Sequence, residues 1–179
     1  MANRFNKILV VGRPGSGKTR FSDRLGRLTG RKITHLDKHI WGPNWKKVSN
    51  AKELRRKKME KLTSANQWVL DGHYLDDIEK RIEKADTIVL FDMPIWQSFY
   101  GIFARWVIGR KNLIDQPPGK RYRISRKIRH LVLNYDNDFL QKAVKKSDNR
   151  DIYMINNYRV SNKILKYIAN EINISKNIN

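Results

Sequence analysis

A glycine-rich stretch near the start of the chain, residues 12–19, limits what this protein can fold into. It reads GRPGSGKT and directly follows the apolar run 8–11, so a strand is expected to lead into a tight loop. Phe21, Leu25 and Leu28 then recur at helical spacing. The pattern G-x-x-x-x-G-K-T between a strand and a helix is typical of a loop whose backbone N–H groups surround phosphate. An ordinary glycine-rich turn is the alternative interpretation.

The loop pattern predicts roles for eight consecutive residues. Lys18 is expected to reach the β- and γ-phosphates of ATP, and the Thr19 hydroxyl is expected to ligate Mg²⁺. The positive end of the following helix adds to the attraction for anions. The predicted phosphate-binding residues are Gly12, Arg13, Pro14, Gly15, Ser16, Gly17, Lys18 and Thr19.

Composition narrows the class of protein. The chain has 179 residues and no cysteine, which predicts a single domain, 1–179, and excludes disulfides and thiolate zinc sites. The start has no signal-peptide pattern, and the most apolar stretch, 94–108, is too short to span a bilayer. We therefore expect a cytoplasmic protein that does not use a membrane. Its oligomeric state cannot be predicted from the sequence.

The formal net charge of +21 predicts attraction to polyanions. Between residues 105 and 129 there are nine Lys or Arg residues and a single acid, Asp115. A phosphate-rich substrate requires such a cluster, and so does a DNA-binding surface. Scattered lysines can also be an ordinary solvated surface, so charge alone does not separate these alternatives.

Short apolar segments alternate with helical patterns along the chain. Because these segments are apolar throughout, they predict a parallel sheet covered on both faces by helices, an α/β three-layer fold of the P-loop NTPase kind. The helix 94–108 is expected to carry Ile95, Phe99, Ile102 and Trp106 on one stripe, and a basic helix from about 125 is expected to bend or break at 134–138. The predicted strands are 7–11, 32–36, 67–70, 87–91 and 151–155, and the other predicted helices are 18–29, 50–64, 76–85 and 161–170.

Three aspartates directly follow predicted strands: Asp37, Asp71 and Asp92. Ligands of open α/β sheets bind beyond the carboxyl ends of the strands, so the three are expected to meet near the phosphate loop. Asp71 and Asp92 are candidates for holding Mg²⁺, and Asp37 is the candidate for orienting an acceptor hydroxyl or acting as its base. Each could instead be a helix N-cap or a turn residue.

Several segments match one family pattern: 12–19, His35-Leu36-Asp37, Trp41, Pro43, Trp45, 68–74, Arg81 and 85–94. On these residues the chain resembles the adenylate-kinase-like P-loop proteins of the bacterial "DNA topology modulation protein" family, over about residues 7–110. That family usually has Asn where this chain has His73, and several arginines where this chain has 136–138.

A wider resemblance links the chain to nucleoside monophosphate and shikimate-type kinases. It implies a nucleoside-monophosphate-kinase-like architecture, with an acceptor-binding helical segment at about 38–66 and a short basic lid loop at about 109–124. It also implies that Arg105 and Arg110, at the entry to the lid, neutralise charge on the transferred phosphate. Arg81 matches the family pattern, whereas its place beside the buried position Ile82 favours an exposed side chain.

Two functions follow from these features. The first is an ATP-binding, Mg²⁺-dependent phosphotransferase that acts on a nucleotide or another small metabolite. Its predicted catalytic residues are Lys18, Asp37, Arg81, Arg105 and Arg110. The alternative is a nucleotide-binding regulator that associates nonspecifically with DNA through its basic surface. His35 is expected to be a packed or hydrogen-bonded histidine rather than a metal ligand.

Overall fold

The fold is a parallel sheet of five strands in the order β2-β3-β1-β4-β5. It is taken from a computed structural model that describes residues 4–36, 51–72, 75, 78–108, 126–147 and 150–178. The predicted α/β class and the number of strands are confirmed, and two strands have the predicted bounds. The strands are β1 (Lys7–Gly12), β2 (Ile33–His35), β3 (Trp68–Asp71), β4 (Thr87–Phe91) and β5 (Asp151–Ile155).

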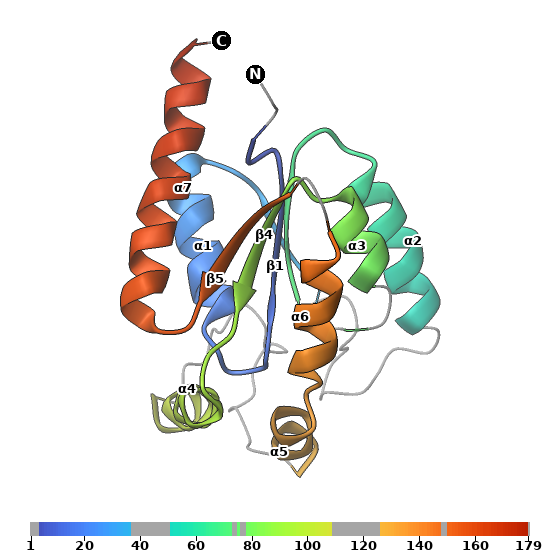
Figure 1. The fold of residues 1–179 in the computed structure, drawn as a ribbon, viewed down its shortest axis with the longest axis vertical. Helices are drawn as coiled ribbons and strands as arrows, with labels where there is room; N and C mark the ends of the chain where they lie inside the picture. Colours follow the sequence, from blue (N-terminus) through green and yellow to red (C-terminus); the bar gives the residue numbers. More distant parts are fainter. Residues whose placement is uncertain are drawn as a thin grey trace.

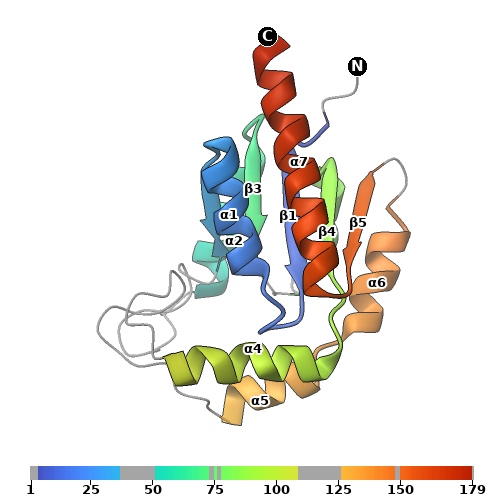
Figure 2. The ribbon, with the colours of Figure 1, turned by 90° about the vertical axis from the view of Figure 1, so that its left-hand side faces the viewer.

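Helices cover both faces of this sheet (Figure 1). One face carries α1 (Lys18–Thr29) and α7 (Tyr158–Ile178), and the other carries α2 (Ala51–Thr63), α3 (Ile78–Lys84) and α6 (Asn137–Lys145). The remaining two described helices, α4 (Ile95–Ile108) and α5 (Arg126–Leu133), lie beyond the ends toward which the strands run (Figure 2). The three-layer arrangement is therefore present, and α4 and α5 form a further pair of helices beyond the carboxyl ends of the strands.

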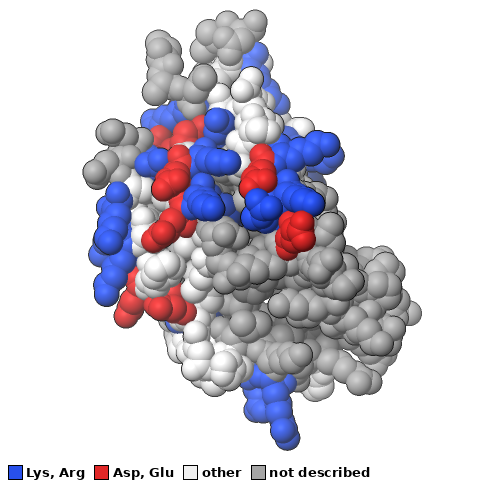
Figure 3. All heavy atoms as spheres, turned by 90° about the vertical axis from the view of Figure 1, so that its right-hand side faces the viewer, with Lys and Arg blue, Asp and Glu red and all other residues white. Residues whose placement is uncertain are grey.

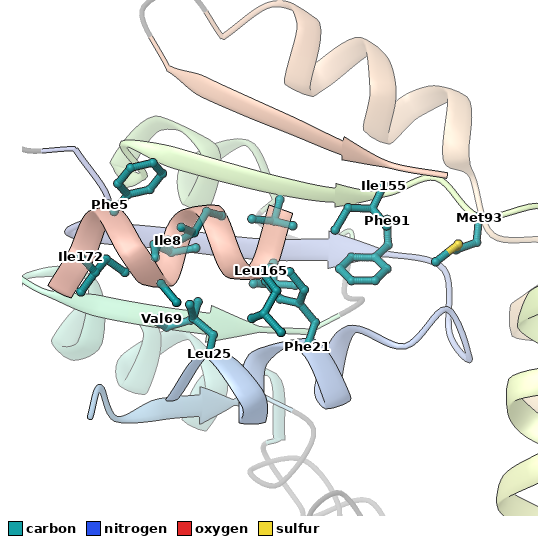
Figure 4. Packing of buried hydrophobic residues seen from close by; sticks show 14 residues of the cluster. Phe5, Ile8, Phe21, Leu25, Val69, Phe91, Met93, Ile155, Leu165 and Ile172 are labelled. Atoms are coloured by element: carbon teal, nitrogen blue, oxygen red, sulfur yellow. The ribbon is translucent and has the colours of Figure 1, made fainter. Parts of the chain in front are cut away.

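A separate apolar cluster joins each helix layer to the sheet. On the α1 and α7 side, Phe21, Leu25 and Leu165 pack toward the sheet residue Ile8 (Figure 4). Successive residues of a strand point to opposite faces, so Leu9 belongs to the cluster on the other side. The strand β1 is therefore buried on both faces.

The pairing of β1 decides which groups lie beside the phosphate loop. On one side Val10 is aligned with Asp71 of β3, and on the other side Gly12 is aligned with Phe91 of β4. Asp92 follows Phe91 directly. Two strand-end carboxylates therefore flank the strand that leads into the loop.

The helix α4 departs from the prediction for its apolar stripe. Ile102 is buried, but Ile95 and Trp106 are 38% and 53% exposed, because α4 crosses the end of the sheet and packs through a narrow face. Trp96 and Tyr100 are exposed as well.

None of the helices in the described ranges is both long and apolar enough to cross a membrane.

The C-terminal third is broken where the polar segment 134–138 predicts it. The helix α5 ends at Leu133, and α6 begins after Asp136, whose carboxylate accepts a hydrogen bond from the backbone N–H of Phe139. The helix α7 is longer than the predicted 161–170. Asn157 caps its start, and Ile172 continues its buried face.

On the face that carries α2, α3 and α6, the described basic side chains are interspersed with acidic ones over its upper part (Figure 3). On α2, for instance, Arg56 pairs with Glu60 and Lys57 pairs with Glu53. Such exposed pairs contribute little stability, but they offset local charge. The strongly basic sequence 105–129 has only one acidic residue, and most of it lies outside the described residues.

The substitution Leu25→Ala tests the packing of α1. Leu25 is fully buried, so removing its side chain should lower the free energy of unfolding by about 2–5 kcal/mol. Leu28→Ala is the matched control, because Leu28 lies on the same helix and is 49% exposed; its effect should stay within about 0.5 kcal/mol. Urea unfolding measures both, and equal effects would contradict the described orientation of α1.

Candidate active site around the phosphate loop

The phosphate loop packs directly against the helix α4. Gly15 has a φ of +82°, and a Cβ atom built on it would lie 2.3 Å from the carbonyl oxygen of Ser98. A Cβ atom built on Gly101 would lie 2.2 Å from the carbonyl oxygen of Gly15. Contacts this close leave room only for glycine at both positions. The helix α4 therefore forms a wall against the apex of the loop.

Lys18 is buried within the loop. Its Nζ donates hydrogen bonds to the carbonyl oxygen of Arg13, at 2.7 Å, and to Oγ of Ser16, at 3.4 Å. The helix α1 begins after Gly17 without a side-chain cap, so the N–H groups of its first turn point toward the loop without a capping oxygen from that position. A buried ammonium beside a helix N-terminus attracts phosphate oxygens.

Asp71, at the end of β3, belongs to a chain of three hydrogen-bonded side chains, two of which are buried. Its Oδ2 lies 2.9 Å from Nδ1 of His35 on β2, and Nε2 of the same ring lies 3.0 Å from Oδ1 of Asp23 on α1. Both His35 and Asp71 are buried. The prediction of a hydrogen-bonded His35 is confirmed, and its ring joins α1 to two strands.

The two carboxylates determine the protonation of His35. Burial alone would lower the pKa of His35, but the hydrogen bond and charge of Asp71, together with those of Asp23, outweigh it and raise the pKa above its ordinary value. Carboxylates only accept hydrogen bonds, so a ring that donates from both nitrogens satisfies both partners. The geometry therefore favours the imidazolium form.

Asp92, after β4, is held from the opposite layer. Its Oδ1 accepts a hydrogen bond from Nδ2 of Asn137 at 2.6 Å, and its Oδ2 accepts one from Nε2 of Gln141 at 2.9 Å. Both donors lie on α6. The amides are neutral, so they orient the carboxylate without neutralising its charge.

The residues around the loop fit a magnesium ion. Mg²⁺ prefers oxygen ligands and keeps several waters, so it requires few ligands from the protein. The half-buried Thr19 hydroxyl and the carboxylate of Asp92 or Asp71 are oxygen donors of this kind. Across the described ranges, no cluster of three or more His, Asp or Glu side chains is placed to hold a metal. Phosphate oxygens of a bound nucleotide, together with water, would supply the other ligands of such an ion.

Arg81 lies on α3 and is only 2% exposed, so the expectation of an exposed side chain is wrong. The neighbouring Ile82 is buried in the same apolar cluster as Leu140 of α6, which shows that α6 covers this part of α3. Burial raises the pKa of Tyr135, and the positive charges of Arg81 and Arg13 offset part of that rise. The charges of both guanidinium groups therefore act on the same hydroxyl.

Several predicted site residues lie where the structure does not describe them. Asp37, Arg110, the lid loop 109–124 and the part of the acceptor segment before residue 51 lie outside the described residues. Arg105 lies on α4. The roles of these residues stay predictions.

A cavity of about 910 Å³ lies at the opposite end of the strands. Its lining includes several cations with structural partners. Lys84 donates to Oγ1 of Thr63, and Arg150 donates to the carbonyl oxygen of Ala85. This cavity is far along the strands from the loop, and we assign the phosphate chemistry to the loop instead.

Five neighbours of the site were not predicted from the sequence. Asp23 reaches His35 only because distant segments pack together, and the same is true of the α6 amides that donate to Asp92. Such contacts leave no local pattern in the sequence. Gly101 sits within an apolar helix, where a glycine signals a close approach of another backbone. That glycine is the one signal that could have been used. The five residues are Asp23, Gly101, Tyr135, Asn137 and Gln141.

The pKa of His35 predicts how stability depends on pH. Because the folded state holds the proton more tightly than the unfolded state, the contribution of His35 is fully present below about pH 6.5 and is lost as pH rises through the raised folded pKa. Urea unfolding from pH 5.5 to 9 should show the difference between wild type and His35→Gln shrinking with pH. His130→Gln, on the exposed surface of α5, is the control. A difference that grows with pH would contradict the imidazolium form.

The contact between Gly15 and Gly101 predicts an effect of Gly101→Ala on nucleotide binding. Alanine normally stabilises a helix interior by roughly 1 kcal/mol over glycine, but here its Cβ must push the loop backbone away. We expect affinity for Mg·ADP to fall about tenfold or more, as measured by calorimetry. Tyr100→Ala, whose side chain is 63% exposed, should leave the affinity unchanged. An unchanged affinity in Gly101→Ala would show that the loop tolerates displacement.

No family model and no curated protein matches the chain. Solved structures do. A shikimate kinase from Acinetobacter baumannii in complex with shikimate has a TM-score of 0.59 and 18% identity, covering 92% of this chain and 93% of that chain. A gluconokinase from Sinorhizobium meliloti 1021 has a TM-score of 0.57 and 13% identity, covering 97% of this chain and 99% of that chain. At these identities the likeness shows the fold alone. The resemblance to DNA topology modulation proteins stays a prediction, and the chain has the fold of P-loop kinases.

Proposed function

We propose that the protein is an ATP-dependent kinase that transfers the γ-phosphoryl group of ATP to a small acceptor, with Mg²⁺ as cofactor. One observation carries the proposal: the buried ammonium of Lys18 lies in a glycine loop between two strand-end carboxylates, Asp71 and Asp92. Phosphoryl transfer requires mainly this combination of fixed cations, backbone donors and a metal-binding oxygen edge.

The loop residues would bind the nucleotide. In the proposed complex, backbone N–H groups of 12–19 and the first turn of α1 donate to phosphate oxygens, and Lys18 exchanges the carbonyl of Arg13 for a phosphate oxygen. Lys18 is already buried, so little side-chain freedom is lost when it binds. Water excluded by the wall of α4 would strengthen these interactions.

Thr19 and Asp92 are the best candidates for the metal. Asp92 is held by two neutral amides, whereas Asp71 faces a His35 ring that favours the cationic form. A bound Mg²⁺ would supply charge neutralisation on the phosphates. In this proposal Asp71 chiefly anchors β2 and α1 beside the loop.

The other predicted residues act on the acceptor and on the transferred group. Asp37 would orient the acceptor hydroxyl, and Arg81, Arg105 and Arg110 would neutralise developing charge. The related folds include proteins named shikimate kinase and gluconokinase, which supports a small molecule as acceptor. A nucleotide acceptor fits the same proposal.

The experiment is an assay of ADP release from Mg·ATP against a panel of acceptors. The panel holds nucleoside monophosphates, nucleosides, sugars, small hydroxy acids and duplex DNA. We expect one small acceptor to stimulate release, and Lys18→Ala to reduce that rate about 100-fold or more, because the variant loses the cation on the phosphates. Lys163→Ala makes the same charge change on the exposed side of α7 and should keep the rate.

The outcomes separate the two predicted functions. Stimulation by one small acceptor that depends on Lys18 establishes a kinase and identifies its substrate class. Stimulation by duplex DNA alone would favour the nucleotide-binding regulator, and steep loss with salt would mark that contact as nonspecific. Binding of ATP without any stimulation would leave the kinase proposal unsupported for these acceptors.

A further inference from the structure

We infer that the outer side of α4, flanked by α5, docks on the surface of an anionic membrane. The docking face combines the exposed apolar side chains of α4 with exposed basic side chains of α5. The inference goes beyond the proposed kinase function and does not depend on it. The apolar members of the face are Trp96, Tyr100, Phe103, Trp106 and Val107, and its basic members are Arg126 and Arg129.

The apolar members lie along one side of α4. Positions 96, 100, 103 and 107 recur at spacings of four, three and four residues, which places them on one stripe of a helix. Trp106 lies beside this stripe, with its ring centroid 5.7 Å from that of Phe103. All five side chains are between 52% and 64% exposed. A contiguous exposed apolar patch of this kind marks an interaction site.

The opposite side of α4 is fixed to the protein. Gly101 lies against the loop backbone at Gly15, and Ile102 is buried in a small cluster with Val132 of α5. The helix therefore lies on its side across the carboxyl ends of the strands (Figure 2). Its exposed stripe faces outward along its length, which is the orientation in which an interfacial helix meets a membrane surface.

The docking face carries positive charge without acidic residues. Neither α4 nor α5 contains Asp or Glu, whereas α2 pairs its basic side chains with acidic ones. Arg126 and Arg129 are exposed on α5, and basic side chains project from the lower end of the molecule, where α5 lies (Figure 3). Basic side chains beside an apolar face attract anionic lipid headgroups. The charge therefore favours an anionic partner.

A second copy of the chain fits this face less well. Two docking faces would bring the arginines of both copies together, and neither face has an acid to pair with them. Each chain also has a net charge of +21. Like charges across an interface oppose association.

A nucleic acid has the required charge, but its bases bind by stacking on the flat faces of aromatic rings. Val107 has no ring, and the rings of Phe103 and Trp106 pack against each other at an interplanar angle of 42°. Trp and Tyr side chains have an apolar body and a polar tip, which suits the boundary between headgroups and acyl chains. The mixture of aliphatic and aromatic side chains therefore favours a lipid surface.

This docking needs no membrane-spanning segment. The helix α4 has 14 residues, which is too short to span a bilayer. The expectation from the sequence that the protein does not use a membrane rests on the lack of a spanning segment and of a signal peptide. A helix that lies in the plane of the membrane surface requires only an apolar side and nearby positive charge.

The test is sedimentation of the whole protein with lipid vesicles in the absence of nucleotide. Vesicles of equal parts phosphatidylglycerol and phosphatidylcholine are the anionic probe, and vesicles of phosphatidylcholine alone are the neutral one. We expect binding to the anionic vesicles to be at least about tenfold tighter. The double variant Trp96→Ser, Phe103→Ser should weaken it about tenfold or more. Both side chains are exposed, so urea unfolding should show wild-type stability.

Two controls separate the docking face from the overall positive charge. Leu28→Ser removes an apolar side chain that is 49% exposed on α1, and it should not change vesicle binding. Lys163→Gln removes a charge from the exposed side of α7, and it should weaken binding less than Arg129→Gln does. Equal vesicle binding by wild type and the double variant Trp96→Ser, Phe103→Ser would overturn the docking face, because net charge alone would then account for the binding.

Vesicles of lipids brominated in their acyl chains locate the contact. They should quench the tryptophan fluorescence of the bound protein, and they should quench less in Trp96→Tyr, which keeps an interfacial aromatic side chain and should still bind. Unchanged quenching in Trp96→Tyr would overturn the placement of α4 at the membrane.

Two other results would assign the face to a different partner. If vesicles do not bind, and the double variant instead loses binding of a single-stranded oligonucleotide or loses dimers seen in sedimentation equilibrium, the lipid proposal is overturned. The vesicle assay contains no ATP and no acceptor. Its failure would therefore leave the kinase proposal untouched, and failure of the kinase assay would leave the docking face untouched.

Discussion

The parallel pairing of β1 with β3 on one side and β4 on the other is the constraint on which the rest of the structure depends. The strand is buried on both faces, so only its neighbours can satisfy its backbone N–H and C=O groups. A shift by one residue would turn every side chain to the wrong face. The hydrogen bonds that hold the sheet therefore also fix the loop between Asp71 and Asp92.

The two flanking carboxylates are held by different chemistry. Asp71 is bound by His35, which continues to Asp23, so it is tied to α1 and the edge strand β2. Asp92 is bound by the amides of Asn137 and Gln141, so it is tied to α6. Each helix layer thus holds one side of the loop, and the charge on the two sides is unequal.

Local signals account for what could be predicted from the sequence. Three features each depend on a short pattern: the strand that leads into the loop, the helix from Lys18 to Thr29, and the aspartates Asp71 at the end of β3 and Asp92 directly after β4. The structure has them at or near the predicted places. Partners that come from distant segments leave no such pattern. Asn137, for example, lies 45 residues after the carboxylate it binds.

The burial of Arg81 could not be predicted from the local sequence either. The helix α3 has seven residues, so its periodicity says little about which side faces the core. The covering helix α6 decides the matter, and it belongs to a part of the chain where polar residues 134–138 obscure the apolar pattern. The aromatic side chains of α4 are exposed for a different reason. That helix crosses the carboxyl ends of the strands and does not pack on a face of the sheet.

The close approach of Gly15 and Gly101 makes the phosphate motif longer than the eight residues that spell it. Gly101, in the middle of a distant helix, belongs to the same structural unit as the loop, because a side chain at either glycine would collide with the backbone of the other segment. A helix grafted from another protein in place of α4 would need a glycine at that position to leave the loop in its shape. The loop and the helix α4 are therefore one structural element for anyone who redesigns this site, although they lie far apart in the sequence.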